Sequence, residues 1–268
     1  MLDWKSLPVG DHRTACPVCS KGTRDSAASV TIDTDGRVVL HCFRCGTVLT
    51  HRGEARSAMH RPVSRKPRRE SLGAWGMALW DECEPIAGVA MSYLRSRRCR
   101  IPPEDGDLRW HPRVKHPSGH IGPALVGLIT HVETRAPLSL HRTWITSTGK
   151  AHVSPTRMPL AGHSTAGGCI RLWPDEAVTY GLAIAEGVET ALSIAWAYAP
   201  AWSTIDAGHL AKFPVLPGVQ TLVIGQDRDP AGENAAQACA QRWADADREV
   251  LVTRQAANDL NDVLQEAV

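Results

Sequence analysis

The chain lacks any long hydrophobic run. No apolar stretch in its 268 residues approaches the ~20 residues that a membrane-spanning helix needs, so we expect no membrane segment and no membrane partner. The first five residues, Met-Leu-Asp-Trp-Lys, lack the basic and then apolar layout of a signal peptide. Hydrophobic and charged contents of 43% and 22% are ordinary for a protein with a core. These absences favour a soluble protein of the cytoplasm.

Disulfide bonds are also not expected, although the chain has eight cysteines. Four of them form two Cys-x-x-Cys pairs, Cys16-Pro-Val-Cys19 and Cys42-Phe-Arg-Cys45. In a cytosolic protein this paired spacing indicates metal binding rather than crosslinking. The other four stand alone, and we interpret them as buried small apolar residues: Cys83, Cys99, Cys169 and Cys239.

Residues 1–50 are predicted to form a zinc ribbon. Residues 28–33 and 37–41 are strand-like, and Thr34-Asp35-Gly36 between them contains the Asp-Gly signal of a hairpin. Such a hairpin returns the chain so that the two cysteine pairs meet, and four thiolates give Zn²⁺ a closed, structural site. Because so small a module has almost no apolar core, we expect the metal to supply most of its folding free energy.

The partner of this ribbon is left open between nucleic acid and protein, and its cations favour nucleic acid. The nearby His12 and His41 are interpreted as packing or surface residues, because four cysteines already suffice for zinc. Candidate phosphate contacts are Lys21, Arg24, Arg37 and Arg44.

Basic and acidic residues are unevenly divided along the chain. Residues 1–70 carry 13 Lys/Arg against 7 Asp/Glu, and residues 71–174 carry 12 against 7. Residues 175–268 carry 5 against 14, so the front of the chain is basic and the back is acidic. The front suits polyanions such as nucleic acid, and the back suits metal cations. For the middle segment, charge scattered over solvated faces is the alternative.

Residues 51–70 are predicted to be a flexible basic linker, because they hold seven Lys/Arg and two prolines and show no apolar periodicity. The linker either follows a phosphate backbone or is a solvated tether. Residues 71–174 are predicted to be an α+β segment. Its expected elements are helices at 72–83 and 85–98 and an antiparallel strand pair at 124–132 and 138–145.

Three cations of the α+β segment are candidate phosphate ligands. Arg142, Lys150 and Arg171 stand at predicted strand ends or in glycine-bearing turns, where a cation can meet phosphate, and ordinary surface charge is the alternative. The tryptophans of the segment are predicted to be core rather than base-stacking residues: Trp75, Trp80, Trp110 and Trp144.

Residues 175–268 alternate short apolar runs with helix-forming stretches. Such alternation predicts an α/β fold, a parallel sheet flanked by helices. The predicted strands are 182–185, 201–205, 219–224 and 249–253, and the predicted helices are 188–198, 209–213, 231–246 and 260–266.

Two of these strands end abruptly in carboxylates. Glu186 follows the first strand, and Asp227 and Asp229 follow the third. Ligands of open α/β sheets gather outside the carboxyl ends of the strands, so we expect these side chains to converge on Mg²⁺, a hard ion that prefers carboxylate oxygen. The alternative for the aspartates is a structural turn, because Asp-Pro and Ala-Gly favour turns.

These residues carry a family resemblance. Ala185-Glu186-Gly187 and Asp227-x-Asp229-x-x-Gly232, each after a strand, resemble the Toprim (topoisomerase–primase) domain. With the cysteine module in front, nearly the whole chain is similar to the zinc-ribbon plus Toprim primases of phages, plasmids and integrated elements. The further motifs that carry this likeness are Glu186-Gly-Val-Glu-Thr-Ala-Leu-Ser193, Arg142-Thr-Trp144, Gly149-Lys150-Ala, Gly167-Gly168 with Arg171, and Asn258-Asp-Leu-Asn-Asp262-Val-Leu264.

The resemblance implies roles for single residues. Glu186 would take part in acid–base chemistry or metal binding at the reacting 3′-hydroxyl. Asp227 and Asp229 would hold catalytic Mg²⁺, for which Mn²⁺ can substitute. Residues 71–174 would be the N-terminal subdomain of the primase, and residues 175–268 the Toprim domain.

The roles of three further acidic residues are left open. Asp262 or Asp259 would add a metal ligand, whereas Asp259 is also well placed to cap a helix. Glu189 lies one helical turn beyond Glu186, and it either supports the site or faces solvent.

The implied function is that of a primase, a nucleotidyltransferase that makes short oligonucleotides from nucleoside triphosphates on a single-stranded DNA template. One alternative is a Toprim nuclease, because the same metal carboxylates can direct water at a phosphodiester. Another is a non-catalytic module that binds single-stranded DNA or recruits a helicase. The sequence contains no Gly-x-x-x-x-Gly-Lys-Ser/Thr P-loop, so a separate replicative helicase is the expected partner.

Overall fold

A computed structural model describes residues 7–20, 22, 25–52, 68–253 and 259–266. Lys21, Arg24 and most of the segment predicted as a linker lie outside these residues. The chain divides into two compact units, one of residues 1–66 with 229–231 and one of residues 67–228 with 232–268. None of the helices within the described ranges combines the length and apolar character of a transmembrane segment.

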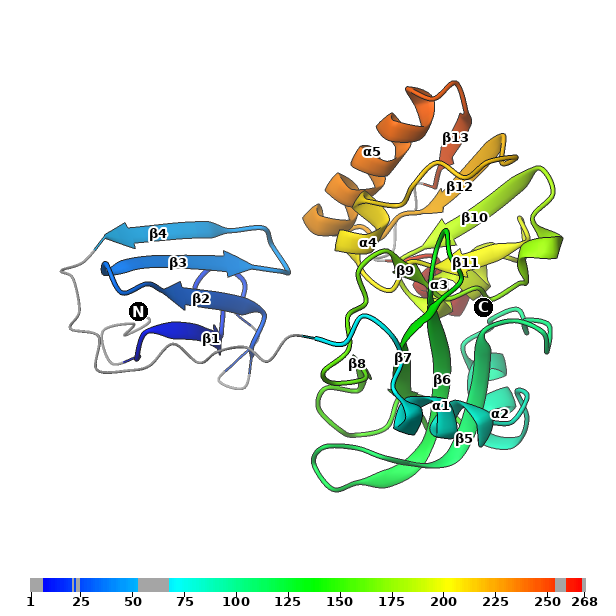
Figure 1. Ribbon diagram of the computed structural model, residues 1–268, viewed down its shortest axis with the longest axis horizontal. Helices are drawn as coiled ribbons and strands as arrows, with labels where there is room; N and C mark the ends of the chain where they lie inside the picture. The colour runs from blue at the N-terminus through cyan, green and yellow to red at the C-terminus, as the bar shows by residue number, and fades with distance from the viewer. Residues whose placement is uncertain (1–6, 21, 23–24, 53–67, 254–258, 267–268) are drawn as a thin grey trace. The chain divides into compact units, whose positions relative to one another are not determined.

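The first unit is an antiparallel sheet in the strand order β1-β2-β3-β4 (Figure 1). The predicted hairpin is confirmed, and Gly36 takes the left-handed conformation (φ +81°) that its turn requires. The two outer strands were not predicted, and the last one extends two residues into the segment predicted as a linker. The strands are β1 (Gly10–Thr14), β2 (Ala28–Ile32), β3 (Arg37–Cys42) and β4 (Val48–Arg52).

The second unit begins with two helices and an antiparallel sheet, as predicted for the α+β segment. The strand order is β5-β6-β7-β8, with β9 pairing β6. The predicted strand pair corresponds to β6 and β7. The elements are α1 (Ala74–Asp81), α2 (Gly88–Ser96), β5 (Leu108–Lys115), β6 (Ile121–His131), β7 (Pro137–Trp144), β8 (Arg157–Pro159) and β9 (Gly168–Cys169).

The prediction of a core position is wrong for one of the four tryptophans. Trp75 is 64% exposed, whereas Trp80 and Trp144 are buried and Trp110 is half-buried. The buried side of α1 carries Gly76 and Trp80, four residues apart, and the buried Leu72 precedes the helix by two residues. Because each helical residue turns by about 100°, Trp75 points away from that side.

A parallel sheet in the order β11-β10-β12-β13 completes the second unit (Figure 1). The predicted alternation of strands and helices is confirmed, with the first helix ending four residues earlier than expected. The elements are a short 3-10 helix η2 (Asp175–Ala177), strands β10 (Gly181–Ala185), β11 (Ala201–Ser203), β12 (Thr221–Gly225) and β13 (Glu249–Val252), and helices α3 (Val188–Ile194), α4 (Ala207–Ala211), α5 (Pro230–Ala244) and α6 (Leu260–Glu266).

The two faces of this sheet belong to two different cores, as the period-2 geometry of strands dictates. Leu182 and Ile184 of β10 pack in one core with α5 residues such as Trp243. Ala183 and Ala185 of the same strand pack in the other with α3 and with Tyr93 of α2. The second core therefore joins the antiparallel sheet region to the parallel sheet across the boundary predicted at residues 174 and 175.

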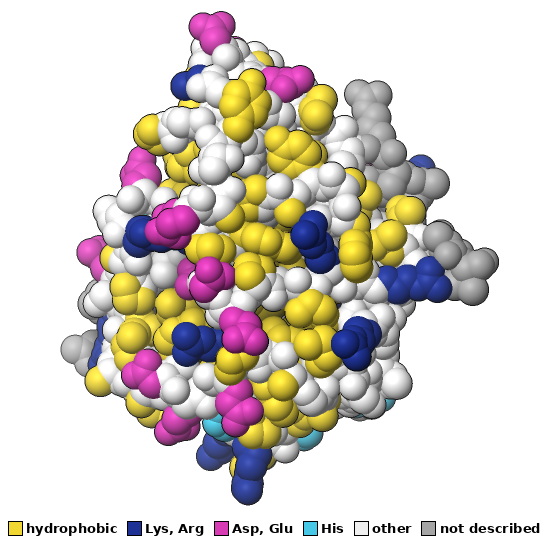
Figure 2. All heavy atoms as spheres, turned by 90° about the vertical axis from the view of Figure 1, so that its right-hand side faces the viewer, with side chains coloured by type: hydrophobic (Ala, Val, Ile, Leu, Met, Phe, Trp, Pro, Cys, Tyr) yellow, Lys and Arg dark blue, Asp and Glu magenta, His cyan; other side chains and the backbone are white. Residues whose placement is uncertain are grey.

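Charged side chains of both signs mix with hydrophobic ones on the face of the molecule in Figure 2. The unequal division of charge along the sequence therefore does not make this face uniformly acidic or basic.

The four isolated cysteines are buried, as predicted. Burial raises the pKa of each thiol to about 12, so these side chains stay protonated near neutral pH and act as small apolar groups. They are Cys83, Cys99, Cys169 and Cys239.

Candidate functional sites

The four cysteines of the first unit form a metal-binding cluster. Their sulfur atoms all lie within 4.8 Å of one another, with Cys16 and Cys45 at 3.7 Å and Cys19 and Cys42 at 3.6 Å. A tetrahedron with Zn–S bonds of about 2.3 Å has edges of about 3.8 Å, so the sulfur positions fit zinc. Four thiolates would fill every position around a bound zinc ion, which indicates a structural rather than a catalytic role for the cluster.

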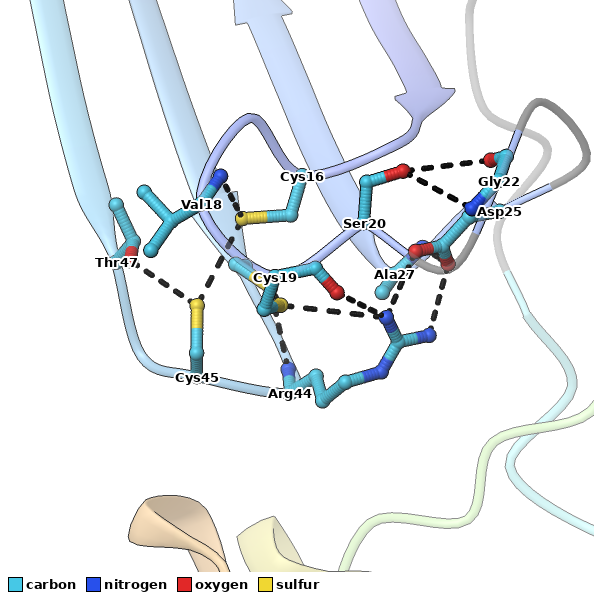
Figure 3. Close-up of polar contacts among 11 residues, drawn as sticks. Cys16, Val18, Cys19, Ser20, Gly22, Asp25, Ala27, Arg44, Cys45 and Thr47 are labelled. Carbon is cyan, nitrogen blue, oxygen red and sulfur yellow. Dashed lines mark hydrogen bonds and ion pairs between the residues drawn. The ribbon is translucent and has the colours of Figure 1, made fainter.

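The backbone around the cysteines supports the same arrangement (Figure 3). In each Cys-x-x-Cys turn a backbone N–H donates to the first sulfur, from Val18 to Cys16 and from Arg44 to Cys42, both at 3.4 Å. These bonds orient the thiolates and stabilise their charge.

Arg44, predicted as a phosphate contact, is engaged within the cysteine module. Its guanidinium makes a two-pronged ion pair with Asp25 at 2.7 and 2.8 Å and donates to the Cys19 carbonyl at 2.9 Å (Figure 3). The side chain is 32% exposed. Arg37, at the start of β3, is exposed. Of the two, Arg37 is the freer to meet a phosphate, and both assignments remain predictions.

The predicted catalytic carboxylates lie at a topological switch point of the parallel sheet. The chain leaves β10 towards β11 on one side and leaves β12 towards β13 on the other, and β10 and β12 are neighbours. Glu186 follows β10 directly, and Asp227 comes two residues after β12, where Ala185 and Gly225 are paired in register. Crevices at such switch points are where open α/β sheets bind ligands.

Contacts to the backbone carbonyl groups of Glu186 and Asp227 fix the positions of these two residues. Both are half-buried. The Ser203 hydroxyl donates to the Glu186 carbonyl at 2.7 Å. Gly232 lies so close to Asp227 that a Cβ on it would be 2.7 Å from the Asp227 carbonyl oxygen. The glycine of the Asp-x-Asp-x-x-Gly pattern is therefore required by close packing against the first aspartate.

Asp229 is also half-buried, directly before α5. Within the described ranges, the cysteine cluster is the one group of three or more His, Cys, Asp or Glu side chains whose ligand atoms lie close together. Glu186 and Asp227 thus follow the same edge of the sheet, and no closed carboxylate cluster is found among the described residues. Their donor atoms, hard carboxylate oxygens, match the ligands that Mg²⁺ takes in proteins.

A second charged cluster surrounds Glu189, on the first turn of α3. Its carboxylate accepts a hydrogen bond from the Tyr93 hydroxyl at 2.7 Å and pairs with the Lys150 ammonium at 3.3 Å. Although burial raises the pKa of Glu189, Lys150, Tyr93 and Arg157 outweigh it and lower the value to about 2. The Glu189 side chain is only 8% exposed, so the solvent-facing alternative is wrong, and its support of the site stays a prediction.

Comparison with known families assigns part of the second unit. The family model of the Toprim domain matches residues 181–267. This segment is a Toprim domain. The resemblance drawn from Glu186-Gly187 and the Asp-x-Asp-x-x-Gly pattern is therefore confirmed for the domain. A model described as a domain of unknown function (DUF7146) matches residues 71–172, and a search of curated proteins finds no match to the chain.

Two solved primase structures resemble the chain over most of its length. The primase fragment of the bacteriophage T7 primase-helicase protein is 15% identical, with 94% of this chain and 93% of that one covered and a TM-score of 0.42. The zinc-binding and RNA polymerase domains of Aquifex aeolicus primase are 14% identical, with 96% and 76% covered and a TM-score of 0.44. The likeness is distant, and the assignment of the Toprim domain rests on its family match and sheet topology.

Two of the three cations predicted ahead of the Toprim domain are buried. Arg171 donates to Asp175 at 2.6 Å and to the Val132 carbonyl at 2.7 Å, and it stacks on Trp202. Arg142 donates to the Pro159 carbonyl at 3.2 Å. Each is only 4% exposed. These contacts give both arginines a structural place, and their prediction as phosphate contacts finds no support in them.

The acidic motif at the end of the Toprim domain has a structural use. The Asp259 carboxylate caps α6 by accepting from the Asp262 N–H at 2.9 Å, as the capping alternative expects. Asn261 is fully buried and donates to the Arg97 carbonyl at 2.6 Å and to the Ser193 hydroxyl at 2.9 Å. Asp262, the possible metal ligand, lies 3.7 Å from the Arg97 guanidinium.

One cation beside the Toprim site was missed by the sequence reasoning. Arg157, exposed on β8, has its Nη1 atom 3.6 Å from the position of a Cβ on Gly187. It therefore lies beside the Glu186–Gly187 turn. No local motif marks it, because β8 is a three-residue strand in a segment without apolar periodicity.

Proposed function

We propose that the protein is a DNA primase that synthesises short oligonucleotide primers from nucleoside triphosphates on single-stranded DNA. The observation that supports this most directly is a Toprim domain with Glu186 and Asp227 at its switch point, in a chain that also carries a four-thiolate cluster. The proposed reaction is nucleotidyl transfer, in which a 3′-hydroxyl attacks the α-phosphate of a triphosphate and pyrophosphate leaves.

In this proposal Asp227 and Asp229 hold Mg²⁺, and Glu186 binds metal or accepts the proton of the 3′-hydroxyl. When bound, the ion supplies charge neutralisation on the triphosphate and favours the nucleophilic form of the hydroxyl. Lys150 is 37% exposed and provides a cation for the phosphates. Arg157, beside the Glu186–Gly187 turn, provides a second one. The carboxylates thus serve the reacting oxygen, and the cations serve the leaving group.

The cysteine module and the basic segment behind it are proposed to engage the template. Arg37 is an exposed cation on that module. Zinc, held by Cys16, Cys19, Cys42 and Cys45, would supply folding free energy and no chemistry. Strand separation on duplex DNA requires a helicase, which we propose as the partner.

A synthesis assay separates this function from its two alternatives. The protein is incubated with single-stranded DNA, labelled nucleoside triphosphates and Mg²⁺. New short products are expected for a primase. Shortened template would instead indicate a nuclease, and retarded but unchanged template would indicate a binding module.

Two substitutions test the site. Glu186→Gln and Asp227→Asn keep size and remove charge, and each is expected to lower synthesis by a factor of about 100 or more. Asp245→Asn, at an exposed position directly after α5, is the matched control and is expected to leave synthesis unchanged. Full synthesis by both site variants would refute the assignment of these carboxylates.

A further inference from the structure

Glu189 is a buried carboxylate with partners from two other segments of the chain. Its Oε1 atom accepts from the Tyr93 hydroxyl of α2 at 2.7 Å and lies 3.3 Å from Lys150 Nζ. Lys150 is itself anchored by a β-bridge to Ile145 at the end of β7. Burying a carboxylate costs free energy. Packing alone therefore does not explain why a charged residue occupies this position.

The ion pair is open on one side only. The Lys150 side chain is 37% exposed, whereas that of Glu189 is 8% exposed. A ligand arriving from solvent therefore reaches the ammonium and not the carboxylate. Tyr93 is fully buried, and burial together with the neighbouring Glu189 raises its pKa, so it remains a neutral hydrogen-bond donor that fixes the carboxylate.

Two other titratable side chains, His141 and Arg157, face Glu189, and neither of them is acidic. The pKa of His141 is lowered to about 4 by burial and by Arg157, so this imidazole is neutral near pH 7. Glu189 and Arg157 also flank the turn that carries Glu186. A Cβ on Gly187 would lie 3.6 Å from Arg157 Nη1 and 4.0 Å from Glu189 Oε2.

We propose that Glu189 is a positioning residue that, together with Tyr93, holds the Lys150 ammonium next to the Glu186–Gly187 turn, where Lys150 binds the triphosphate of the incoming nucleotide. This inference rests on the proposed function for its role in the reaction. The binding of a triphosphate can be measured without synthesis, so the two can fail separately.

The principal experiment is Glu189→Gln, which keeps the size of the side chain and raises the charge of the cluster by one. Affinities for inorganic tripolyphosphate and for ATP are measured by calorimetry on the full chain. A positioning role predicts affinity about tenfold weaker, the effect of losing one charge-assisted contact, although the cluster has become more positive. If Glu189 only neutralises Lys150, the same variant binds more tightly, and the proposal is overturned.

The matched control is Glu176→Gln. Glu176 is exposed, 3.6 Å from Arg135, so this variant makes the same change of charge away from the cluster. Its affinity for tripolyphosphate is expected to match that of the original protein. An equal loss of affinity in both variants would mean that the loss is not specific to position 189, and the proposal is overturned.

A double-mutant cycle tests whether Glu189 acts through Lys150. Lys150→Met is expected to weaken tripolyphosphate binding, and in that background Glu189→Gln should change affinity by less than about twofold. Full additivity of the two effects would overturn the proposal. Should Glu189→Gln fail to fold, Tyr93→Phe keeps the ring and removes one hydrogen bond, and a smaller loss of affinity is expected. No loss in that variant would also overturn the proposal.

Parallel synthesis assays separate the inference from the proposed function. For a primase, Glu189→Gln is expected to raise the KM for nucleoside triphosphates more than it lowers kcat. If triphosphate binding depends on Glu189 but no primer is made, the positioning role stands and the proposed primase function is wrong. If the variant makes primers with an unchanged KM for nucleoside triphosphates, the proposed primase function stands and the positioning role of Glu189 is wrong.

Discussion

The cysteine module and the Toprim domain reach a stable fold by different means. The core of the first holds seven buried residues, and two of these, Cys16 and Cys42, belong to the cysteine cluster. The core on the α5 face of the Toprim sheet holds fifteen buried residues, without a metal cluster in the described part. We propose that the first region depends on a bound metal and the second on apolar burial, so the two should respond differently to the same treatments.

Removing zinc should have the largest effect, and it should be confined to the first region. Structural zinc contributes about 10–16 kcal/mol in small zinc-binding domains, whereas a module of about 50 residues has a net stability of only about 3–8 kcal/mol. With a chelator or with Cys42→Ser, the amide resonances of residues 7–52 should lose their dispersion while those of the Toprim domain persist. Zinc content measured by elemental analysis should fall in parallel. Loss of both sets of resonances, or of neither, would contradict this contrast.

A core substitution in the Toprim domain should produce the reverse pattern. Ile184 is fully buried between the sheet and α5, and Ile184→Ala should cost about 2–5 kcal/mol of unfolding free energy by creating a cavity. Denaturant unfolding followed by tryptophan fluorescence measures this, because Trp243 shares that core. The zinc-to-protein ratio should stay unchanged. A drop in zinc content would show that the two regions fold as one.

The helix after β12 offers a test of intermediate size at the site itself. Gly232→Ala places a methyl group 2.7 Å from the Asp227 carbonyl oxygen, so α5 or Asp227 must shift, at a cost of about 1–3 kcal/mol. Synthesis should fall more than stability does, because Asp227 moves from its position. Asn234→Ala, on the exposed side of the same helix, should retain both. Full activity of Gly232→Ala would contradict the proposed role of Asp227 in binding metal.

How far the sequence predicts each region depends on how local the determinants are. The alternation of strands and helices in the Toprim domain was predictable because each strand is a short apolar run. The strands β1 and β4 were not, because β1 (Gly-Asp-His-Arg-Thr) has no apolar side chain and β4 is exposed at every position. The burial of Arg142 and Arg171 and the Glu189–Lys150 pair depend on contacts between residues distant in the chain, which no local spacing encodes.

The smallest effect is expected at the acidic motif before α6, where capping and metal binding make different predictions. Asp259 accepts from the Asp262 N–H, so Asp259→Ala should cost about 1 kcal/mol of unfolding free energy by loss of the cap. Asp259→Asn, which also caps well, should recover most of that stability. If Asp259 only caps, the asparagine variant should keep its synthesis rate at every Mg²⁺ concentration. A rate restored only at raised Mg²⁺ would instead make Asp259 a ligand, and the Toprim domain would then depend on metal at its carboxylate edge, as we propose that the cysteine module depends on zinc.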